Sequence, residues 1–365
     1  MAIQVNYGLL RIARQRQGLA QGEAAKRLGI AQVTLSRYEN GASLPSEDFL
    51  RRASDLYDLP ESFFCQPDTA FGAPVSVHPM WRKKHDVTAH ELDAVVAELN
   101  LRAIHIRRLL QAVDHAPKRD IPRFDLEDYD GDIERIASIV RAHWLLPPGP
   151  VQNLTACVEL AGCIVIHSHL NGSAISGVTV SVPGMPPIIL LSTEQPADRM
   201  RFTLAHELGH MVLHRFPSPD MEQEANAFAS ALLMPADEIK IALSGRIDMR
   251  RLAALKPEWR VSMQGLLYRA QSLNLLTKGE AAWLWRQFNM MRIKLREPPE
   301  LDFPAEAPSV LSKMVIMHLH AFGYTEQDIA AMFHLHTHTF REMYPIHQPE
   351  APSATATGAK LRVIR

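Results

Sequence analysis

The stretch Arg201-Phe202-Thr203-Leu204-Ala205-His206-Glu207-Leu208-Gly209-His210 decides the fold of this chain. It contains the pattern H-E-x-x-H, and residues four positions apart in an α-helix lie on one face, one turn apart. His206 and His210 therefore present two imidazoles to one zinc ion, and Glu207 stands beside them as a general base. The alternative is a helix that carries two ordinary histidines, so a third ligand is needed to decide between the two.

The third ligand is predicted from the next helix, residues 220–234, which Pro235 ends. Its apolar residues are spaced three and four apart and form one stripe: Ala225, Phe228, Ala229, Leu232 and Leu233. On a helical wheel Glu222 lies near this stripe and Glu224 lies away from it. An inward carboxylate needs a partner, and a catalytic zinc takes three protein ligands and leaves one position open.

Glu222 is therefore the predicted third ligand, and Glu224 remains the alternative. Asn226 follows Glu222 by one turn and is predicted to support a ligand histidine through a hydrogen bond. In a different interpretation, both glutamates are solvated and are favoured at the helix start by the helix dipole.

Composition limits the classes of protein to which this chain can belong. Its 365 residues suffice for two or three domains, and 47% hydrophobic and 22% charged residues are typical of a globular protein. The net charge of −1 excludes a global basic field, so nucleic-acid binding requires a local patch. Three cysteines without a C-x-x-C pair, no signal peptide and no membrane-spanning run predict a cytoplasmic protein without a membrane partner.

Residues 1–65 predict five short helices with a helix-turn-helix between the second and third. The expected helices are Asn6–Gln17, Gln21–Leu28, Gln32–Glu39, Ser46–Tyr57 and Leu59–Phe64. The turn is Gly29-Ile30-Ala31, and two helices joined by a tight glycine-containing turn are the helix-turn-helix pattern. Such a bundle binds DNA, or it serves protein binding or dimerisation.

Three segments of this region resemble the Cro/cI-type (XRE) DNA-binding domain: Gln21–Ile30, Leu35–Gly41 and Leu44-Pro45. Ala20 stands where the family has a capping threonine. The resemblance implies that double-stranded operator DNA is a partner, that Glu39 pairs with Arg11, and that four residues contact the operator. Of these, Gln21 would touch phosphate at a helix N-terminus and the others would face the major groove: Gln32, Thr34 and Arg37.

The metal motif is similar to that of the ImmA/IrrE family of zinc metallopeptidases. The similarity rests on Arg201–His210, on Leu213-His214, and on the pattern E-x-x-A-N-x-F-A at 222–229 with Leu232-Leu233-Met234-Pro235. These gluzincin-like enzymes are often fused to an XRE domain. The resemblance implies Zn²⁺ as cofactor and cleavage of a partner repressor of the XRE type in a stress or mobile-element response. It also implies His206, His210 and Glu222 as ligands and Glu207 as the base.

His214 extends the row of histidines by one more turn. A fourth protein ligand would close the open zinc position, so a supporting or structural role is expected for His214.

The expected fold is mainly α with a small α+β zinc-peptidase domain. The expected segments are a helix-turn-helix domain (1–65), a helical connector (66–120), the peptidase domain (121–245), a helical C-terminal module (246–350) and a disordered tail (351–365). The connector helix runs from Ala89 to about Val113, capped by Thr88 and Glu91. Strands at 163–167, 175–182 and 188–192 predict a small antiparallel or mixed sheet whose edge aligns a peptide.

Residues 324–335 resemble the first half of a second helix-turn-helix, for which packing or dimerisation is favoured over DNA contact. The predicted protein is thus a homodimeric transcriptional regulator that carries a zinc endopeptidase. One alternative is an XRE regulator, antitoxin-like, whose peptidase-like domain senses or binds without proteolysis. Another is self-cleavage in the connector, at 66–90.

Overall fold

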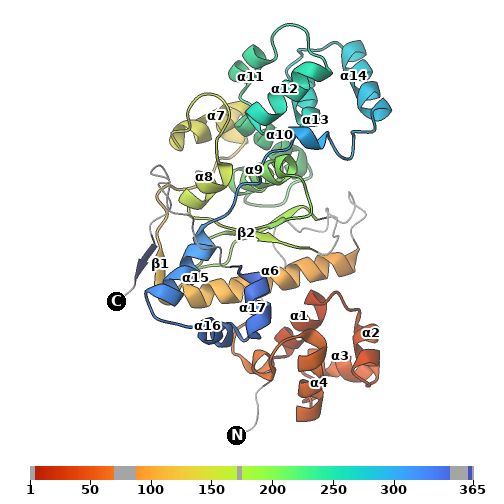
Figure 1. The fold of residues 1–365 in the computed structure, drawn as a ribbon, viewed down its shortest axis with the longest axis vertical. Coiled ribbons are helices and arrows are strands. Elements are labelled where there is room, and N and C mark those ends of the chain that lie inside the picture. Colours follow the sequence, from red (N-terminus) through yellow and green to blue (C-terminus); the bar gives the residue numbers. More distant parts are fainter. Residues whose placement is uncertain (1–4, 70–87, 171–174, 346–360, 364–365) are drawn as a thin grey trace.

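The computed structural model describes residues 5–69, 88–170, 175–345 and 361–363, and in this part the chain is mainly helical around a small sheet (Figure 1). The sheet has the order β2-β4-β3, with β2 at Ile164–Ser168, β3 at Gly177–Val180 and β4 at Ile188–Ser192. β2 runs parallel and β3 antiparallel to β4, which confirms the mixed form of the predicted sheet. Among the described residues, no helix is long and apolar enough to span a membrane.

The sheet separates two hydrophobic cores. Successive residues of a strand point to opposite faces, so β2 and β4 contribute to both cores, and β3 contributes Val178 and Val180 to the first. Ile164, Ile166, Val178, Val180, Ile188 and Leu190 face the first core, and Val165, Ile189 and Leu191 face the second. Burial on both faces explains why these strands are nearly continuous apolar runs in the sequence.

The helices of the N-terminal domain form part of the first core. It contains α1 (Tyr7–Arg16), α2 (Gln21–Arg27), α3 (Gln32–Glu39) and α4 (Glu47–Tyr57), and the fifth predicted helix is the 3-10 helix η1 (Glu61–Cys65). Gly29, between α2 and α3, has a φ of +66°, a left-handed conformation that glycine adopts without strain. The predicted helix-turn-helix therefore forms at the predicted place.

The connector helix α6 (Ala89–Leu109) runs beneath the sheet and beside α1 (Figure 1). Its capping box, Thr88 with Glu91, is the predicted one. The helix ends at Leu109 and not near Val113, because Val113–His115 is the strand β1 and pairs antiparallel with β5 (Leu361–Val363). Part of the tail predicted to be disordered is therefore a strand; residues 346–360 lie outside the described residues. The tail's composition could not show this pairing, because its partner is far away in the sequence.

The second core covers the other face of the sheet. After η3 (Glu127–Tyr129) it contains α7 (Ile133–His143), α8 (Leu154–Leu160), α9 (Ala197–Leu213) and α10 (Met221–Leu233). α11 (Ala236–Ala242), α12 (Met249–Trp259), α13 (Met263–Ser272) and α14 (Lys278–Met290) extend the same core. α9 and α10 pack closely, since a Cβ at Gly209 would lie 3.1 Å from Phe228 Cδ1 and 3.2 Å from Ala225 Cα.

Residues 246–345, expected to form one C-terminal module, divide between the two cores. α12 to α14 belong to the second core, whereas α15 (Val310–His320), α16 (Glu326–Phe333) and α17 (Thr337–Met343) return to the first. The Pro-rich link between the two groups of helices includes η4 (Pro299–Leu301). At its C-terminal end, the amides of Ser309 and Val310 donate hydrogen bonds of 2.8 and 2.9 Å to the carboxylate of Glu159.

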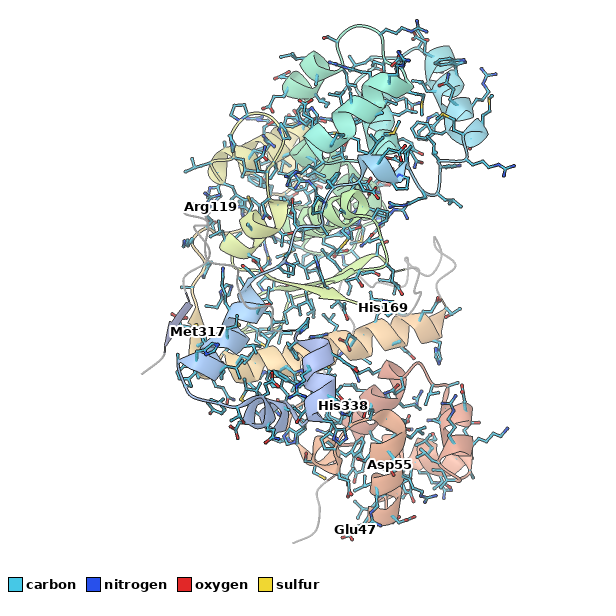
Figure 2. The ribbon with its side chains drawn as sticks, in the orientation of Figure 1. Glu47, Asp55, Arg119, His169, Met317 and His338 are labelled. Atoms are coloured by element: carbon cyan, nitrogen blue, oxygen red, sulfur yellow. The ribbon has the colours of Figure 1, made fainter. Side chains whose placement is uncertain are left out.

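Residues 324–335, which resemble the first half of a helix-turn-helix, contain α16, and a turn with His334 at a φ of 52° leads to α17. The two helices pack against the N-terminal domain. His338, labelled in Figure 2, lies on α17 where this helix meets the N-terminal domain. Its Nε2 is 3.1 Å from Asp58 Oδ1, and Thr339 donates a hydrogen bond of 3.0 Å to the Asp58 carboxylate. These contacts agree with the packing role.

Candidate metal centre and DNA-binding face

α9 and α10 bring together three potential metal ligands, His206, His210 and Glu222, whose ligand atoms all lie within 4.8 Å of one another. The Nε2 atoms of the two histidines are 3.0 Å apart. The Glu222 carboxylate lies 3.4 Å from His210 Nε2 and 3.6 Å from His206 Nε2. Both histidines are buried, and this proximity is the one that the H-E-x-x-H spacing and the helical wheel predict.

Glu224, the alternative third ligand, lies beside a different residue. Its Oε2 accepts a hydrogen bond of 2.9 Å from His214 Nε2. His214 Nδ1 in turn lies 3.0 Å from His210 Nδ1, so Glu224 contacts the group of three only through His214.

The protons of these histidines can be assigned from their partners. A carboxylate only accepts, so His214 carries its proton on Nε2 and accepts at Nδ1 from His210 Nδ1–H. Asn226 Oδ1 accepts from His206 Nδ1–H at 3.0 Å. In neutral imidazoles both Nε2 atoms then bear lone pairs, and these two lone pairs face each other and the Glu222 carboxylate.

Burial favours the neutral state that this assignment requires. It lowers the pKa of His206 below its ordinary value, and it also lowers the pKa of His214. Neutral imidazole is the form that binds a metal.

A divalent cation fits this arrangement. Two nitrogens and a carboxylate, with no proton between them, are a typical donor set for catalytic zinc. Ligand nitrogens at the usual zinc distance in a tetrahedron are about 3.3 Å apart, close to the 3.0 Å between the two Nε2 atoms. Asn226 and the pair His214–Glu224 orient the rings from behind, as partners of metal-bound histidines commonly do.

Glu207, the predicted base, is 2% exposed and lies on the side of α9 that faces β3. Thr179 of β3 donates a hydrogen bond of 2.6 Å to Glu207 Oε2. Sequence reasoning missed Thr179, because only the alternation of β3 hinted that this residue faces away from Val178 and Val180. A residue of the sheet thus holds the carboxylate of Glu207, which α9 supplies, in place.

The recognition helix α3 presents an exposed face. Gln32 and Arg37 are exposed and Thr34 is half-buried. Val33, which sequence reasoning did not select, is 63% exposed at the start of the same helix. An apolar side chain there suits contact with a thymine methyl group.

Two contacts of the N-terminal domain differ from those that the resemblance implied. Glu39 pairs with Arg14, at 2.6 and 2.9 Å, and the predicted pairing with Arg11 is wrong. Arg11 donates instead to the Glu39 carbonyl and to Asn40. Gln21, expected at a phosphate, directs its amide nitrogen to Glu39 Oε2 at 3.1 Å.

Comparison with known protein families gives two matches. Residues 158–271 match the family model of the IrrE N-terminal-like domain, a peptidase M78 domain, and residues 8–62 match that of a helix-turn-helix domain. No curated protein matches the chain. The first match begins within α8 and reaches α13, so it extends past the boundary expected at residue 245. The chain therefore combines an N-terminal helix-turn-helix domain with an IrrE N-terminal-like domain of the peptidase M78 type.

Proposed function

We propose that this chain is a DNA-binding transcriptional regulator that carries a zinc-dependent endopeptidase and cleaves a partner repressor of the XRE type. The observation that carries the proposal is the convergence of the His206 and His210 lone pairs on Glu222, beside the buried Glu207. A zinc site without catalytic activity has no use for Glu207. Cleavage of a repressor would release its target genes in a stress or mobile-element response.

The chemistry follows from the placement of these side chains. When bound by His206, His210 and Glu222, a zinc ion would lower the pKa of a water to about 7 and polarise the scissile carbonyl. Glu207 would take the proton of the attacking water and pass it to the leaving amine. Thr179 holds one carboxylate oxygen of Glu207 and so fixes the direction of this transfer.

The substrate chain would be aligned by β3. Within the described residues the sheet order is β2-β4-β3, so β3 is an edge strand, the place at which a substrate peptide would add. Thr179 of this strand contacts Glu207. A peptide that adds to this edge would therefore pass the general base with its carbonyl groups in a fixed register.

DNA binding would use α3 in the major groove, with Gln32, Thr34 and Arg37 toward the bases. Two copies of the chain would read the two halves of an operator, as dimeric helix-turn-helix proteins do.

The proposal is tested by metal content and by cleavage. Protein purified without chelators should contain about one zinc per chain, as a three-ligand catalytic site requires, and His206→Ala should lose it. Glu207→Gln should keep the zinc and lose cleavage of an XRE-type repressor that wild type cleaves, as followed by mass spectrometry. Wild-type protein that lacks metal under these conditions would contradict the proposal.

One observation favours a second function, that of a regulator whose peptidase-like domain senses without cutting. The N-terminal domain and one face of the sheet share a core, and Thr179 of the same sheet donates a hydrogen bond to Glu207, so the sheet connects the metal centre with the DNA-binding domain. Equal repression by wild type and Glu207→Gln in a reporter assay would support this function. Self-cleavage would appear as a chelator-sensitive fragment in aged protein; most of the 66–90 segment expected for it lies outside the described residues.

A further inference from the structure

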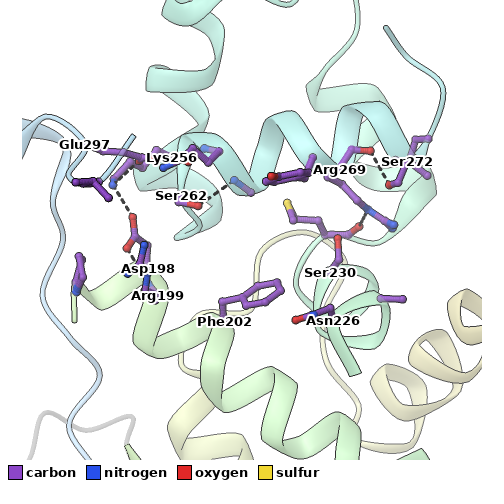
Figure 3. A pocket seen from close by; sticks show the side chains of 18 of the residues that line it. Asp198, Arg199, Phe202, Asn226, Ser230, Lys256, Ser262, Arg269, Ser272 and Glu297 are labelled. Atoms are coloured by element: carbon purple, nitrogen blue, oxygen red, sulfur yellow. Dashed lines mark hydrogen bonds and ion pairs between the residues drawn. The ribbon is translucent and has the colours of Figure 1, made fainter. Parts of the chain in front are cut away.

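A cavity of 740 Å³ lies between α9 and α10 on one side and α12 and α13 on the other. Figure 3 shows Phe202 and Asn226 on one wall, with Lys256, Ser262 and Arg269 opposite. This volume is in the range of pockets that enclose whole small-molecule ligands, and it exceeds the needs of one side chain. All four helices lie at least partly within the region that matches the peptidase family model.

The cavity adjoins the metal centre. Phe202 precedes His206 by four residues on α9, and Asn226 follows Glu222 by four residues on α10. Asn226 lines the cavity and also accepts the hydrogen bond from His206. Four residues of helix span about 6 Å, which is the reach of about two residues of an extended chain.

The buried cations of the cavity wall are neutralised. Lys256 is 1% exposed and lies 2.6 Å from Asp198 and 2.8 Å from Glu297. Arg269, also buried, pairs with Glu134 at 2.9 Å. A buried wall without unpaired charge does not attract a charged group, so it favours an apolar occupant.

The residues at the mouth of the cavity place a second restriction on which side chain can enter it. Tyr268 and Leu295 line it with exposed fractions of 64% and 89%, an unusual exposure for large apolar side chains. Arg199 and Arg296 line it too, both exposed. Asp302 balances the charge of Arg296, so Arg199 is the cation that repels an approaching lysine or arginine.

We propose that this cavity is a specificity pocket, which receives a bulky apolar side chain of the substrate, with part of the adjoining main chain, and rejects basic side chains. This assignment rests on the proposed peptidase activity. Because the pocket opens one helical turn from the metal centre, it selects the residue at one fixed position, about two residues from the cleaved bond.

The test is cleavage of a random peptide library by the zinc-loaded full chain, with products sequenced by mass spectrometry. Phe, Leu, Met or Trp should be enriched, and Lys and Arg depleted, at a single position within about three residues of the cut. Ser230→Phe fills the pocket from α10 and should shift this preference to Gly and Ala. It should also lower kcat/KM for the best wild-type peptide at least tenfold, with zinc content and melting temperature unchanged.

Ala227→Trp, at an exposed position of the same wall, should act in the same direction and guards against a folding defect of Ser230→Phe. The matched control is Ser244→Phe, at an exposed serine that does not line the cavity, and it should leave the preference unchanged. Cleavage without an apolar preference, or a preference that both pocket variants retain, overturns the pocket assignment while the peptidase proposal stands. A zinc-loaded wild type that cuts no peptide overturns both.

Discussion

His214 and Glu224 form a half-buried pair behind the metal centre, with 2.9 Å between His214 Nε2 and Glu224 Oε2. The pair fixes the proton of His210 on Nδ1 and leaves Nε2 free of a proton, in the position where it faces His206. His214 therefore acts on the metal through His210. His214→Phe should weaken zinc affinity by about 10–100-fold, the usual cost of losing such a partner.

Glu224→Gln keeps an acceptor for His214 and should weaken zinc affinity less than His214→Phe does. The control is His320→Phe, at an exposed position of α15. Competition with a chromophoric chelator measures all three variants. Equal zinc affinity of His214→Phe and wild type would show that the pair has no such role.

Gly209 sets the distance between α9 and α10. Its hypothetical Cβ would lie 3.2 Å from both the Cα and the carbonyl oxygen of Ala225. These are backbone atoms of a helix, which cannot move far to make room for a side chain. Gly209→Val should push α10, and Glu222 with it, away from the two histidines. We expect a loss of about 1–3 kcal/mol of unfolding free energy through overpacking, together with weaker zinc binding.

Gly279→Ala is the matched control for this substitution. Gly279 lies in α14 with open space around its hypothetical Cβ, so the alanine should stabilise the protein by about 0.5–1 kcal/mol. Urea unfolding distinguishes the two substitutions, and Gly209→Val with unchanged stability would refute the packing explanation.

Glu98 of α6 pairs with Arg16 of α1 at 3.0 Å and with Arg102 at 2.8 Å, and Arg102 also donates a hydrogen bond to the Met343 carbonyl of α17. Burial alone would raise its pKa, but the guanidinium groups of Arg102 and Arg16 lower the pKa of Glu98 to about 2. A carboxyl with a depressed pKa stabilises the folded state above its unfolded pKa and loses this contribution as pH falls toward the folded pKa. The ion pairs of Glu98 with Arg16 and Arg102 should therefore weaken between about pH 4.5 and pH 2.

Glu98→Gln should cost about 3–5 kcal/mol at pH 7, since it leaves the buried Arg102 and the half-buried Arg16 without their carboxylate. The difference in melting temperature from wild type should narrow as the pH falls below about 4.5, where the wild-type carboxyl also begins to lose its charge. A difference that stays constant over this range would show that the charge of Glu98 is irrelevant.

Arg14 and Arg11 offer a direct comparison in the N-terminal domain. Arg14 is buried against Glu39, whereas Arg11 is exposed. Arg14→Met leaves the Glu39 carboxylate buried without its arginine and should destabilise the domain by about 3–5 kcal/mol. Arg11→Met should cost less than about 1 kcal/mol, and thermal unfolding followed by circular dichroism measures both.

Arg37 is predicted to contact a base of the operator. Arg37→Ala should reduce operator affinity by about 1–3 kcal/mol and relax specificity at one base pair. Electrophoretic mobility shifts over a set of point-mutated operators test this. A uniform loss across all operators, with a shallower salt dependence, would assign Arg37 to phosphate instead.

Local patterns predicted much of the fold and of the candidate site. The spacing of His206 and His210, the inward face of Glu222 and the cap at Thr88 all depend on neighbours within one or two turns, and the structure places each as expected. Helical periodicity cannot report which distant segment a side chain meets. Thr179 lies against Glu207 only because β3 packs on α9, and Glu39 lies nearer to Arg14 than to Arg11 because of how α1 and α3 cross.

Because helical periodicity does not report distant contacts, the sequence also did not predict that residues 246–345 divide between the two cores. α14 and α15 have similar amphipathic sequences, and the Pro-rich link between them gives no hint that it crosses from one core to the other. Ser309 and Val310 bond to Glu159, a residue about 150 positions earlier, which no pattern in the sequence connects to them.

The sheet that separates the two cores limits how this protein can be dissected. A fragment that starts near residue 120 and stops before α15 would carry the metal centre, but it would leave Ile166, Val178 and Leu190 without the helices that cover them. Such a bare apolar face promotes aggregation. The resulting loss of activity would be mistaken for an absence of activity in the intact protein. Assays of the metal centre therefore need the intact chain, and removal of the N-terminal domain would bare the face of α6 that packs on α1.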